Sequence, residues 1–286
     1  MLTERNGLHD ADDGKYPPLI TQIYEIQTPE EVDLLCRIGV DHIGSVLLSA
    51  DVWQQPVIRD TVRAVQNGGK KSSLIPLFND PATVFQALDY YRPDIVHFCD
   101  VLTLTSWGRE ACRRLIDLQR EVQSRFPEVA IMRSIPIGRP SGDTSVPTLA
   151  LAQMFQPVSD LLLTDTVLSS DSGMTNQPVD GFVGITGKTC HWQTARELVR
   201  RSDIPVILAG GLSPENVYDA ILNVVPAGVD SCTRTNMLDR HGDPVRFKKD
   251  MDRVRRFVEE ARRAALSLAS AQDQDRPFPI KRAGLH

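Results

Sequence analysis

The sequence lacks the features that mark secreted and membrane-spanning proteins. Its five cysteines are an odd number and include no Cys-x-x-Cys pair, a pattern that favours reduced thiols over a disulfide framework. No apolar stretch approaches the length of a membrane span. The polar, acidic residues 1–15 have neither the basic start nor the apolar run of a signal peptide. We therefore expect a cytoplasmic protein.

Clusters of basic residues are missing as well. The net charge is −5, and Lys and Arg are spread along the chain. Proteins that bind nucleic acid or anionic membranes usually concentrate their basic residues on one segment. We therefore expect neither nucleic acid nor a membrane as a partner.

Short apolar runs alternate with longer segments of helical periodicity. Buried parallel strands form continuous apolar runs, so eight strand–helix units predict an α/β fold, a (β/α)8 TIM barrel with eight parallel strands. An open doubly wound sheet shows the same alternation. However, no Gly-x-Gly-x-x-Gly motif follows the first run, where a dinucleotide-binding fold usually has one. The runs are residues 19–24, 42–48, 73–78, 95–98, 129–135, 161–164, 206–209 and 229–232.

We expect one barrel domain over residues 17–269, with a flexible arm (1–16) before it and a tail (270–286) after it, where the helical periodicity is lost. Several helix starts are marked by a proline that follows a capping residue. These pairs are Thr28-Pro29, Asp80-Pro81, Ser213-Pro214 and Asp243-Pro244, and Gly39 is a predicted helix stop.

Two segments differ from this rhythm. Residues 165–192 form a long loop rich in Ser, Gly and Thr between the sixth strand and its helix, and such loops are usually functional lids. Residues 106–126 form a long amphipathic helix. Core packing is the default interpretation of its apolar face, and contact with a second copy in a homodimer is the alternative.

The ends of the last two strands carry a candidate anion site. Gly210 and Gly211 end the seventh strand just before a predicted helix, so backbone N–H groups there can approach a ligand closely. Thr233 and Arg234 follow the eighth strand and would add hydroxyl and cation donors. The loops after strands seven and eight are the recurrent phosphate site of this fold. The alternative is that the glycines form only a tight turn and Arg234 lies on the surface.

Four segments resemble the phosphoribosylanthranilate isomerase family. Residues 205–217 and 228–230 are similar to its seventh and eighth strands, and residues 161–166 to its sixth strand. Gly184-Ile-Thr-Gly-Lys-Thr-Cys-His-Trp192 resembles its Gly-Gly-Thr-Gly-Lys-Thr-Phe-Asp-Trp loop. The resemblance covers most of residues 20–264 and is weaker in the N-terminal half.

The resemblance implies an Amadori isomerisation of a phosphorylated amino sugar, without a cofactor. Such a reaction needs an acid to open the sugar ring, a base to remove the C2 proton and a grip on the phosphate. The acid is then Asp165, with its pKa raised beneath the lid. Four residues would hold the phosphate, and three others would contact the substrate. The phosphate residues are Gly210, Gly211, Thr233 and Arg234, and the others are His97, Asp230 and Lys188.

The expected base is where the sequence departs from the family pattern. The family's first strand ends Lys-Ile-Cys-Gly and uses the Cys as base, whereas this chain has Gln22-Ile-Tyr24-Glu25. Tyrosine with a pKa near 10 is a poor base at neutral pH. Tyr24 therefore needs a neighbouring cation, and Glu25 needs to turn inward, for either to be the base. Otherwise Tyr24 packs in the barrel mouth and Glu25 is solvated.

Two further departures affect the aromatic half of the substrate. The family's Gln-Leu-His-Gly after strand four is His97-Phe-Cys-Asp100 here, and no Arg follows strand two before Arg59, where the family grips the anthranilate carboxylate. We therefore expect a sugar-phosphate scaffold with a different substituent or different base chemistry. A lyase or aldolase that acts on a phosphorylated ketose, and a barrel that binds sugar phosphate without turnover, stay as alternatives.

A zinc site is a minor alternative. Thiols and imidazoles fall at several strand or loop ends, and such ligands suit zinc. Buried small thiols and packing histidines explain the same residues without a metal, so no metal is expected. The residues concerned are His97, Cys99, Cys190, His191 and Cys232. Gly187-Lys-Thr189 does not have the glycine spacing of a P-loop.

Overall fold

The structure is a computed structural model that describes residues 19–140, 146–168 and 181–274. Eight parallel strands form a closed barrel in sequence order, each hydrogen-bonded to the next, and β8 pairs with β1 through Ile20↔Gly228 and Gln22↔Asp230. This closure confirms the barrel and excludes the open sheet. The strands are β1 (Ile20–Ile23), β2 (His42–Leu47), β3 (Lys71–Pro76), β4 (Ile95–Phe98), β5 (Ala130–Ile137), β6 (Leu161–Thr166), β7 (Val206–Leu208) and β8 (Gly228–Ser231).

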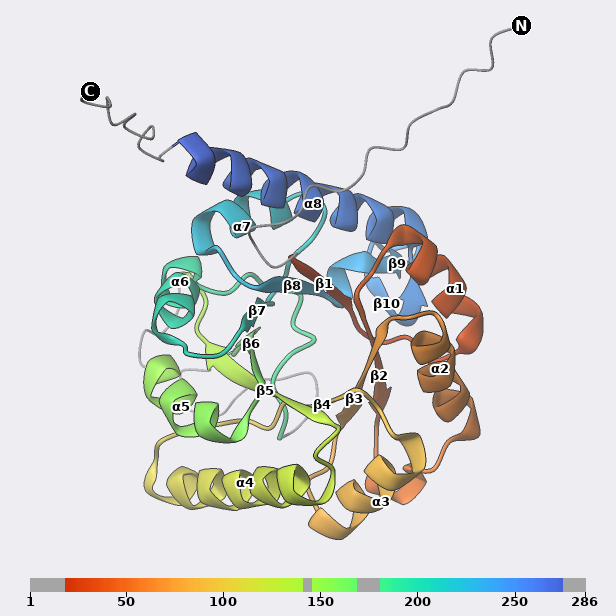
Figure 1. Cartoon of the computed structure of the whole chain (residues 1–286), viewed down its shortest axis with the longest axis vertical. Helices are drawn as coiled ribbons and strands as arrows, with labels where there is room; N and C mark the ends of the chain where they lie inside the picture. The colour runs from red at the N-terminus through yellow and green to blue at the C-terminus, as the bar shows by residue number, and fades with distance from the viewer. Residues whose placement is uncertain (1–18, 141–145, 169–180, 275–286) are drawn as a thin grey trace, which may run out of the picture.

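Helices form a ring around the barrel, as Figure 1 shows. Each helix packs an apolar stripe against the outward-facing side chains of the strands. Buried side chains from helices and strands together form the hydrophobic core between the two layers. The helices are α1 (Pro29–Ile38), α2 (Pro56–Asn67), α3 (Pro81–Tyr91), α4 (Ser106–Arg125), α5 (Thr148–Phe155), α6 (Trp192–Arg201), α7 (Val217–Val224) and α8 (Met251–Gln274).

The predicted helix signals are only partly right. α1 and α3 begin at Pro29 and Pro81, and Gly39 ends α1 in the left-handed conformation. α7 begins at Val217, after a turn that contains the predicted start at Pro214. The start at Pro244 is wrong: that residue opens strand β10.

The strand β10 (Pro244–Lys249) pairs antiparallel with β9 (Asn236–Leu238). This hairpin lies between β8 and α8, on the side of the barrel near α1 (Figure 1). Gly242, in the left-handed conformation, lies in its connecting turn, and the tight turn rather than the proline decides the local structure. The tail was also placed too early, because α8 continues from 270 to Gln274.

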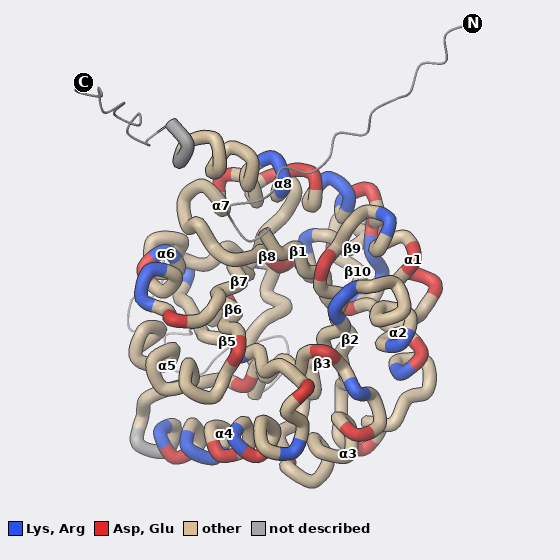
Figure 2. The backbone as a smooth tube through the Cα atoms, in the orientation of Figure 1, with Lys and Arg blue, Asp and Glu red and all other residues tan. Residues whose placement is uncertain are grey.

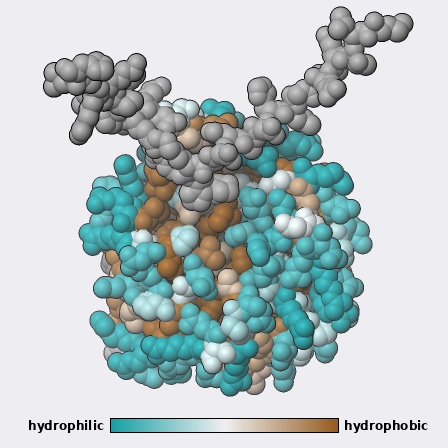
Figure 3. Space-filling view, in the orientation of Figure 1, coloured by the Kyte–Doolittle hydropathy of each residue, from teal (hydrophilic) through white to brown (hydrophobic). Residues whose placement is uncertain are grey.

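The surface matches the charge pattern of the sequence. Lys and Arg alternate with Asp and Glu along the outer helices in Figure 2. Hydrophilic side chains cover most of the outer ring in Figure 3, and hydrophobic ones gather toward its middle. α4 buries Cys112, Leu115, Leu118 and Val122 against the core, which confirms core packing for that face. A homodimer contact stays a prediction. Among the described residues, no helix is long and apolar enough to cross a membrane.

Candidate active site

A cavity of about 770 Å³, counting the space open to solvent, lies at the carboxyl ends of the strands. Its lining comes from most strand ends and from the segment that follows β6. In this fold, that end of the barrel is the catalytic face. The lining includes nine of the ten residues that the sequence analysis proposed for the site: Tyr24, Glu25, His97, Asp165, Gly210, Gly211, Asp230, Thr233 and Arg234.

Gly210 and Gly211 form one end of the cavity. Their φ angles are 103° and 61°, in the left-handed region that favours glycine. A Cβ on Gly211 would lie 2.5 Å from the carbonyl carbon of Lys188, and one on Gly210 would lie 2.5 Å from Oγ1 of Thr166. Within the described chain, the amides of both glycines have no acceptor. Only glycine fits here, and two N–H groups stay available to an anion.

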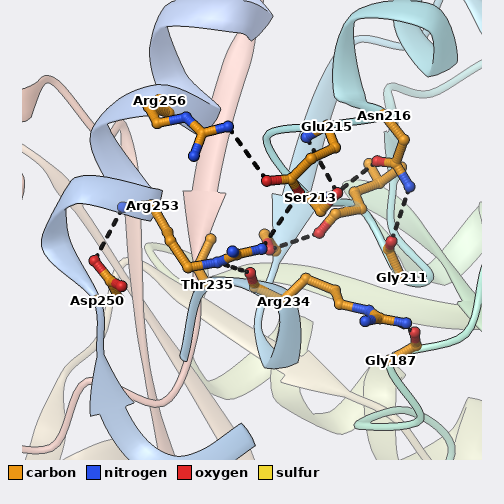
Figure 4. A network of polar contacts seen from close by, with 12 residues as sticks. Gly187, Gly211, Ser213, Glu215, Asn216, Arg234, Thr235, Asp250, Arg253 and Arg256 are labelled. Atoms are coloured by element: carbon orange, nitrogen blue, oxygen red, sulfur yellow. Dashed lines mark hydrogen bonds and ion pairs between the residues drawn. The ribbon is translucent and has the colours of Figure 1, made fainter. Parts of the chain in front are cut away.

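Arg234 lines the same cavity, and Figure 4 shows its side chain extending to Gly187. It lies in a 3-10 turn (Thr233–Thr235) after β8, and its Nε donates to the carbonyl of Gly187 at 2.9 Å. Arg253 of α8 donates to the carbonyl of Arg234 and pairs with Glu215, which also pairs with Arg256. The turn is therefore held from behind by α8, while Arg234 itself faces the cavity.

Asp165 extends from the end of β6 into the cavity. Its Oδ1 accepts from the backbone N–H of Thr166 at 2.9 Å, and no described residue donates to Oδ2. Gly184, with φ of 112°, covers this carboxyl, and a Cβ there would lie 2.6 Å from Oδ2. Burial, followed by the nearby negative charge of Asp230, raises the pKa of Asp165 to about 7. A carboxyl group with such a pKa is suited to donate a proton at neutral pH.

Asp230 is the second aspartate in the cavity, at 7% exposure on β8. Its Oδ1 accepts from Nε2 of Gln22 at 3.1 Å, and Oε1 of Gln22 is hydrogen-bonded to Nδ1 of His42. Burial raises the pKa of Asp230 to about 7, against the opposing effects of Gln22 and Lys249. Asp165 and Asp230 therefore both titrate near neutral pH inside one cavity.

Tyr24 is buried, and its hydroxyl is fully engaged in hydrogen bonds. It lies 2.6 Å from Oγ of Ser73 and 2.7 Å from Nδ1 of His97. The ring occupies space that Gly44 leaves open, since a Cβ on that glycine would lie 2.0 Å from a ring carbon. Burial raises the pKa of Tyr24 well above its usual value. A role as the base requires a cation that lowers this pKa, whereas burial shifts it in the opposite direction.

His97 supports Tyr24 from inside the barrel. Its Nε2 lies 2.8 Å from Oγ of Ser134, so both ring nitrogens have partners. Burial, with a smaller contribution from Arg133, lowers the pKa of His97 to about 3. The imidazole is therefore neutral, and its visible contacts position Tyr24.

Tyr24→Phe is expected to cost about 1–3 kcal/mol of stability, because it leaves buried Ser73 and His97 with one partner fewer. We expect kcat to fall by much less than the roughly 100-fold decrease that removal of a general base causes. Urea unfolding and steady-state kinetics of the variant check both points. A kcat loss of that size in a folded variant would restore Tyr24 as the base.

Glu25 turns inward, as the sequence analysis required, but it is tightly held. Its side chain is 1% exposed and its φ is 65°, an uncommon conformation for a residue other than glycine. Nε of Arg246 in β10 donates to Oε1 at 2.7 Å, and Oε2 accepts from Asn236 and from the N–H of Phe247 at 3.5 Å. The alternative of a solvated Glu25 is wrong, because this carboxylate is buried and pairs with the hairpin.

The lid segment after β6 is anchored to the residues that directly follow β4. Val101 and Val183 donate N–H bonds to the carbonyls of Gly181 and Cys99, respectively, so the two segments pair antiparallel. Lys188 is exposed and absent from the cavity lining. Its carbonyl accepts from Thr166. The structure therefore gives Lys188 a backbone role and not the predicted side-chain contact. Residues 169–180 of the predicted lid lie outside the described residues.

The zinc alternative finds no support among the described residues, where no three His, Cys, Asp or Glu side chains are grouped to hold a metal. Cys190 is buried, and burial raises the pKa of its thiol to about 12. Burial also raises the pKa of the thiols of Cys99 and Cys232. Neutral buried thiols fit the packing interpretation.

Several contributors to the site were not anticipated. Gln22 is on β1 and Tyr24 directly follows this strand, and period-two alternation places both on the inner face. That signal was available in the sequence. Arg246 was hidden because the hairpin was taken for a helix start. Ser73 and Ser134 give no signal before the strands are brought together.

Comparison with known proteins shows which proteins this chain is similar to. A model described as N-(5'phosphoribosyl)anthranilate (PRA) isomerase matches residues 139–233. An enzyme of that name from Methanocella arvoryzae is 28% identical over 245 residues, 82% of this chain and 94% of its own length. The chain is a relative of the phosphoribosylanthranilate isomerases. One from Haloferax volcanii is 42% identical over 116 residues, which are 41% of this chain and 44% of that protein.

Solved phosphoribosylanthranilate isomerases share the fold. The enzyme from Pyrococcus furiosus superposes with a TM-score of 0.57 at 19% identity over 86% of this chain and all of its own. The Thermotoga maritima enzyme gives 0.58 at 17% identity over 85% of this chain and 98% of its own, and a second structure shows monomers generated from that dimeric enzyme. The family match covers Asp165, the glycine pair and Asp230, while Tyr24 and Glu25 lie outside it.

Proposed function

We propose that the protein isomerises an N-substituted 5-phosphoribosylamine to the matching 1-amino-1-deoxyketose phosphate. The first substrate to test is N-(5'-phosphoribosyl)anthranilate, after the name of its relatives. The observation that carries this proposal is one cavity that combines an anion cradle with Asp165, a carboxyl group whose pKa is raised to about 7. The reaction needs those two elements at opposite ends of one sugar phosphate.

The phosphate is assigned to the amides of Gly210 and Gly211, to Thr233 and to Arg234. Gripping it fixes the sugar in register with Asp165. Asp165 then protonates the ring oxygen as the bond to C1 breaks. The lid segment covers that carboxyl through Gly184, which limits access of water to the reacting atoms.

The alternatives are less well supported. An aldolase that forms a Schiff base needs a lysine in the cavity, and the described lining contains none. A barrel that only binds its ligand gains nothing from two aspartates in one cavity whose pKa values are raised to about 7, and such groups are typical of acid–base catalysis.

The test is turnover of N-(5'-phosphoribosyl)anthranilate by the purified protein, followed as formation of the ketone. A second substrate is the phosphoribosyl derivative of aniline, which lacks the carboxylate on the ring. It is informative because Arg234, the one cation of the described lining, is assigned to the phosphate, so no other cation there is left for a ring carboxylate. Turnover of either supports isomerisation, and their ratio reports whether a carboxylate on the ring is recognised. Absence of turnover with both would overturn the proposed function.

Arg234→Gln is expected to raise KM about 10- to 100-fold, since a hydrogen bond to a charged group contributes about 1.5–3 kcal/mol. Inorganic phosphate should raise the melting temperature of the wild-type protein and of the control Arg196→Gln, an exposed α6 residue, but only weakly that of Arg234→Gln. An unchanged KM in Arg234→Gln would remove Arg234 from the phosphate site.

A further inference from the structure

We propose that Asp230 is the base that removes the C2 proton, so that two aspartates, Asp165 and Asp230, perform the isomerisation as acid and base. This inference rests on the proposed function and assigns the step for which the sequence offered only Tyr24 and Glu25. The inference is based on the hydrogen bonds that each candidate base in the cavity already makes.

The other candidate bases are unsuited in different ways. The hydroxyl of Tyr24 is bonded to Ser73 and His97, and burial raises its pKa. Both nitrogens of His97 have partners. Both oxygens of Glu25 accept bonds from the hairpin, including the guanidinium of Arg246, so its lone pairs are engaged. Burial holds the lining cysteines Cys99 and Cys232 as neutral thiols by raising their pKa values.

Asp230 differs because one oxygen is held and the other is available. Gln22 fixes Oδ1, and within the described residues no group donates to Oδ2. Gln22 is itself oriented by His42, so the carboxylate has a fixed direction. Asp165 has the same arrangement, with Thr166 on Oδ1. Each aspartate therefore presents one unbonded oxygen to a shared cavity.

The strands place the two aspartates on either side of the sugar site. Asp165 is on β6 and Asp230 on β8, and β7 lies between them. After β7 come Ala209 and Gly210, which line the cavity with the least possible side-chain volume. This leaves room above β7 for a ring held by its phosphate at Gly211. An acid and a base can then act on neighbouring atoms of one substrate.

The proton steps balance between the two groups. Asp165 gives its proton to the ring oxygen as the C1–O bond breaks and a C1=N iminium forms. The Asp230 carboxylate takes the proton from C2, and the released electron pair forms the C1=C2 enolamine. Asp230 then returns that proton to C1, and Asp165 accepts the proton of the C2 hydroxyl as the ketone forms. Both groups end in their starting state.

The charge surroundings suit this division of roles. Two coupled carboxyl groups near neutral pH share protons as a pair. Asp230 is near the cation of Lys249 as well as Gln22, and both favour its ionised form. Asp165 faces the charge of Asp230 and only a backbone N–H, which favours its protonated form.

The test compares Asp230→Asn with Asp165→Asn, using substrate that carries deuterium at C2. We expect Asp230→Asn to lose about 100-fold or more in kcat, as removal of a general base does, with little change in KM. Its residual rate should show a larger deuterium isotope effect than that of the wild type, because C2–H cleavage becomes limiting. In Asp165→Asn ring opening becomes limiting, so the isotope effect should shrink. If Asp230 had only a structural role, the isotope effect would not change in opposite directions in the two variants.

Chemical rescue and a control complete the test. Formate should restore part of the activity of Asp230→Ala by replacing the missing carboxylate. Asp219→Asn, on the exposed side of α7, should behave like the wild type. If wild-type protein turns substrate over and Asp230→Asn raises only KM, Asp230 is a binding residue and the proposal is overturned. If the wild type is inactive on both substrates, the proposed function fails and this inference fails with it.

Discussion

Asp165→Asn is expected to reduce kcat by about 10³, within the range of 10² to 10⁴ that general acid catalysis contributes. Asparagine fills the same space beneath Gly184 and can keep the bond from the N–H of Thr166. It cannot supply a proton to the ring oxygen. KM should change little, because the phosphate grip lies at Gly211 and Arg234. Steady-state kinetics measure both constants.

The pH dependence follows from the same carboxyl group. Burial raises the pKa of Asp165 to about 7, and the donor must be protonated, so kcat should fall as pH rises through about 7. In an unfolded chain the carboxyl has its ordinary pKa near 4. The raised folded pKa therefore stabilises the fold fully below pH 4 and loses that contribution as pH rises to about 7. Asp165→Asn should thus unfold at a higher temperature than the wild type at pH 8.

Its control is Asp89→Asn, an exposed aspartate on α3. This variant should match the wild type in kcat and in melting temperature. If Asp165→Asn keeps at least a tenth of the wild-type kcat at pH 7, ring opening does not depend on Asp165 and another acid must be found.

Arg133→Met is expected to destabilise the protein by about 3–5 kcal/mol, because it leaves a buried charge without its partner. The side chain of Arg133 is 0% exposed, and Nη1 pairs with Asp100 at 2.8 Å. Nε donates to Gln119 of α4 at 2.7 Å, and the guanidinium stacks near Phe98 and Phe155. The free energy of unfolding from urea titration measures the loss.

Two further variants give the prediction its control. Asp100→Asn in the Arg133→Met background removes the stranded charge and should recover part of the loss, which a double-mutant cycle measures. Arg120→Met, in an exposed pair with Asp117 on α4, should change stability by less than about 1 kcal/mol. Equal effects for Arg133→Met and Arg120→Met would show that burial does not set the contribution of Arg133.

The pair also supports the lid from behind. Asp100 accepts from Asn79 as well as from Arg133. The adjacent Val101 bonds to the lid at Gly181. Loss of the ion pair should therefore loosen the lid anchor before it affects Asp165 directly.

The sequence predicts the barrel well because each strand is a local apolar run and each helix a local periodic segment. It also predicts the phosphate end, since Gly210 and Gly211 require glycine for a local backbone reason that their φ angles confirm. The state of Tyr24 could not be predicted in this way. Its buried hydroxyl is hydrogen-bonded to Ser73 and His97, which are 49 and 73 residues away.

Glu25 shows the same limit more strongly. Its partner Arg246 is 221 residues further along the chain. Arg246 lies in a hairpin where the Asp243-Pro244 pair had predicted a helix start. Asp230 was recognised by resemblance, but its hydrogen bond to Gln22 spans 208 residues. Contacts of this length arise only from barrel closure, and no local pattern in the sequence encodes them.

The same closure sets an order of events during synthesis. β1 finds its second neighbour only when β8 is made, and Glu25 finds its partner only when β10 follows. A nascent chain that has emerged only as far as β7 therefore carries two open sheet edges, and open edges pair with other chains. The glycine pair and Asp165 are by then already available, but the acid–base cavity is incomplete. The last quarter of the chain thus both completes the site and ends the period in which aggregation competes with folding.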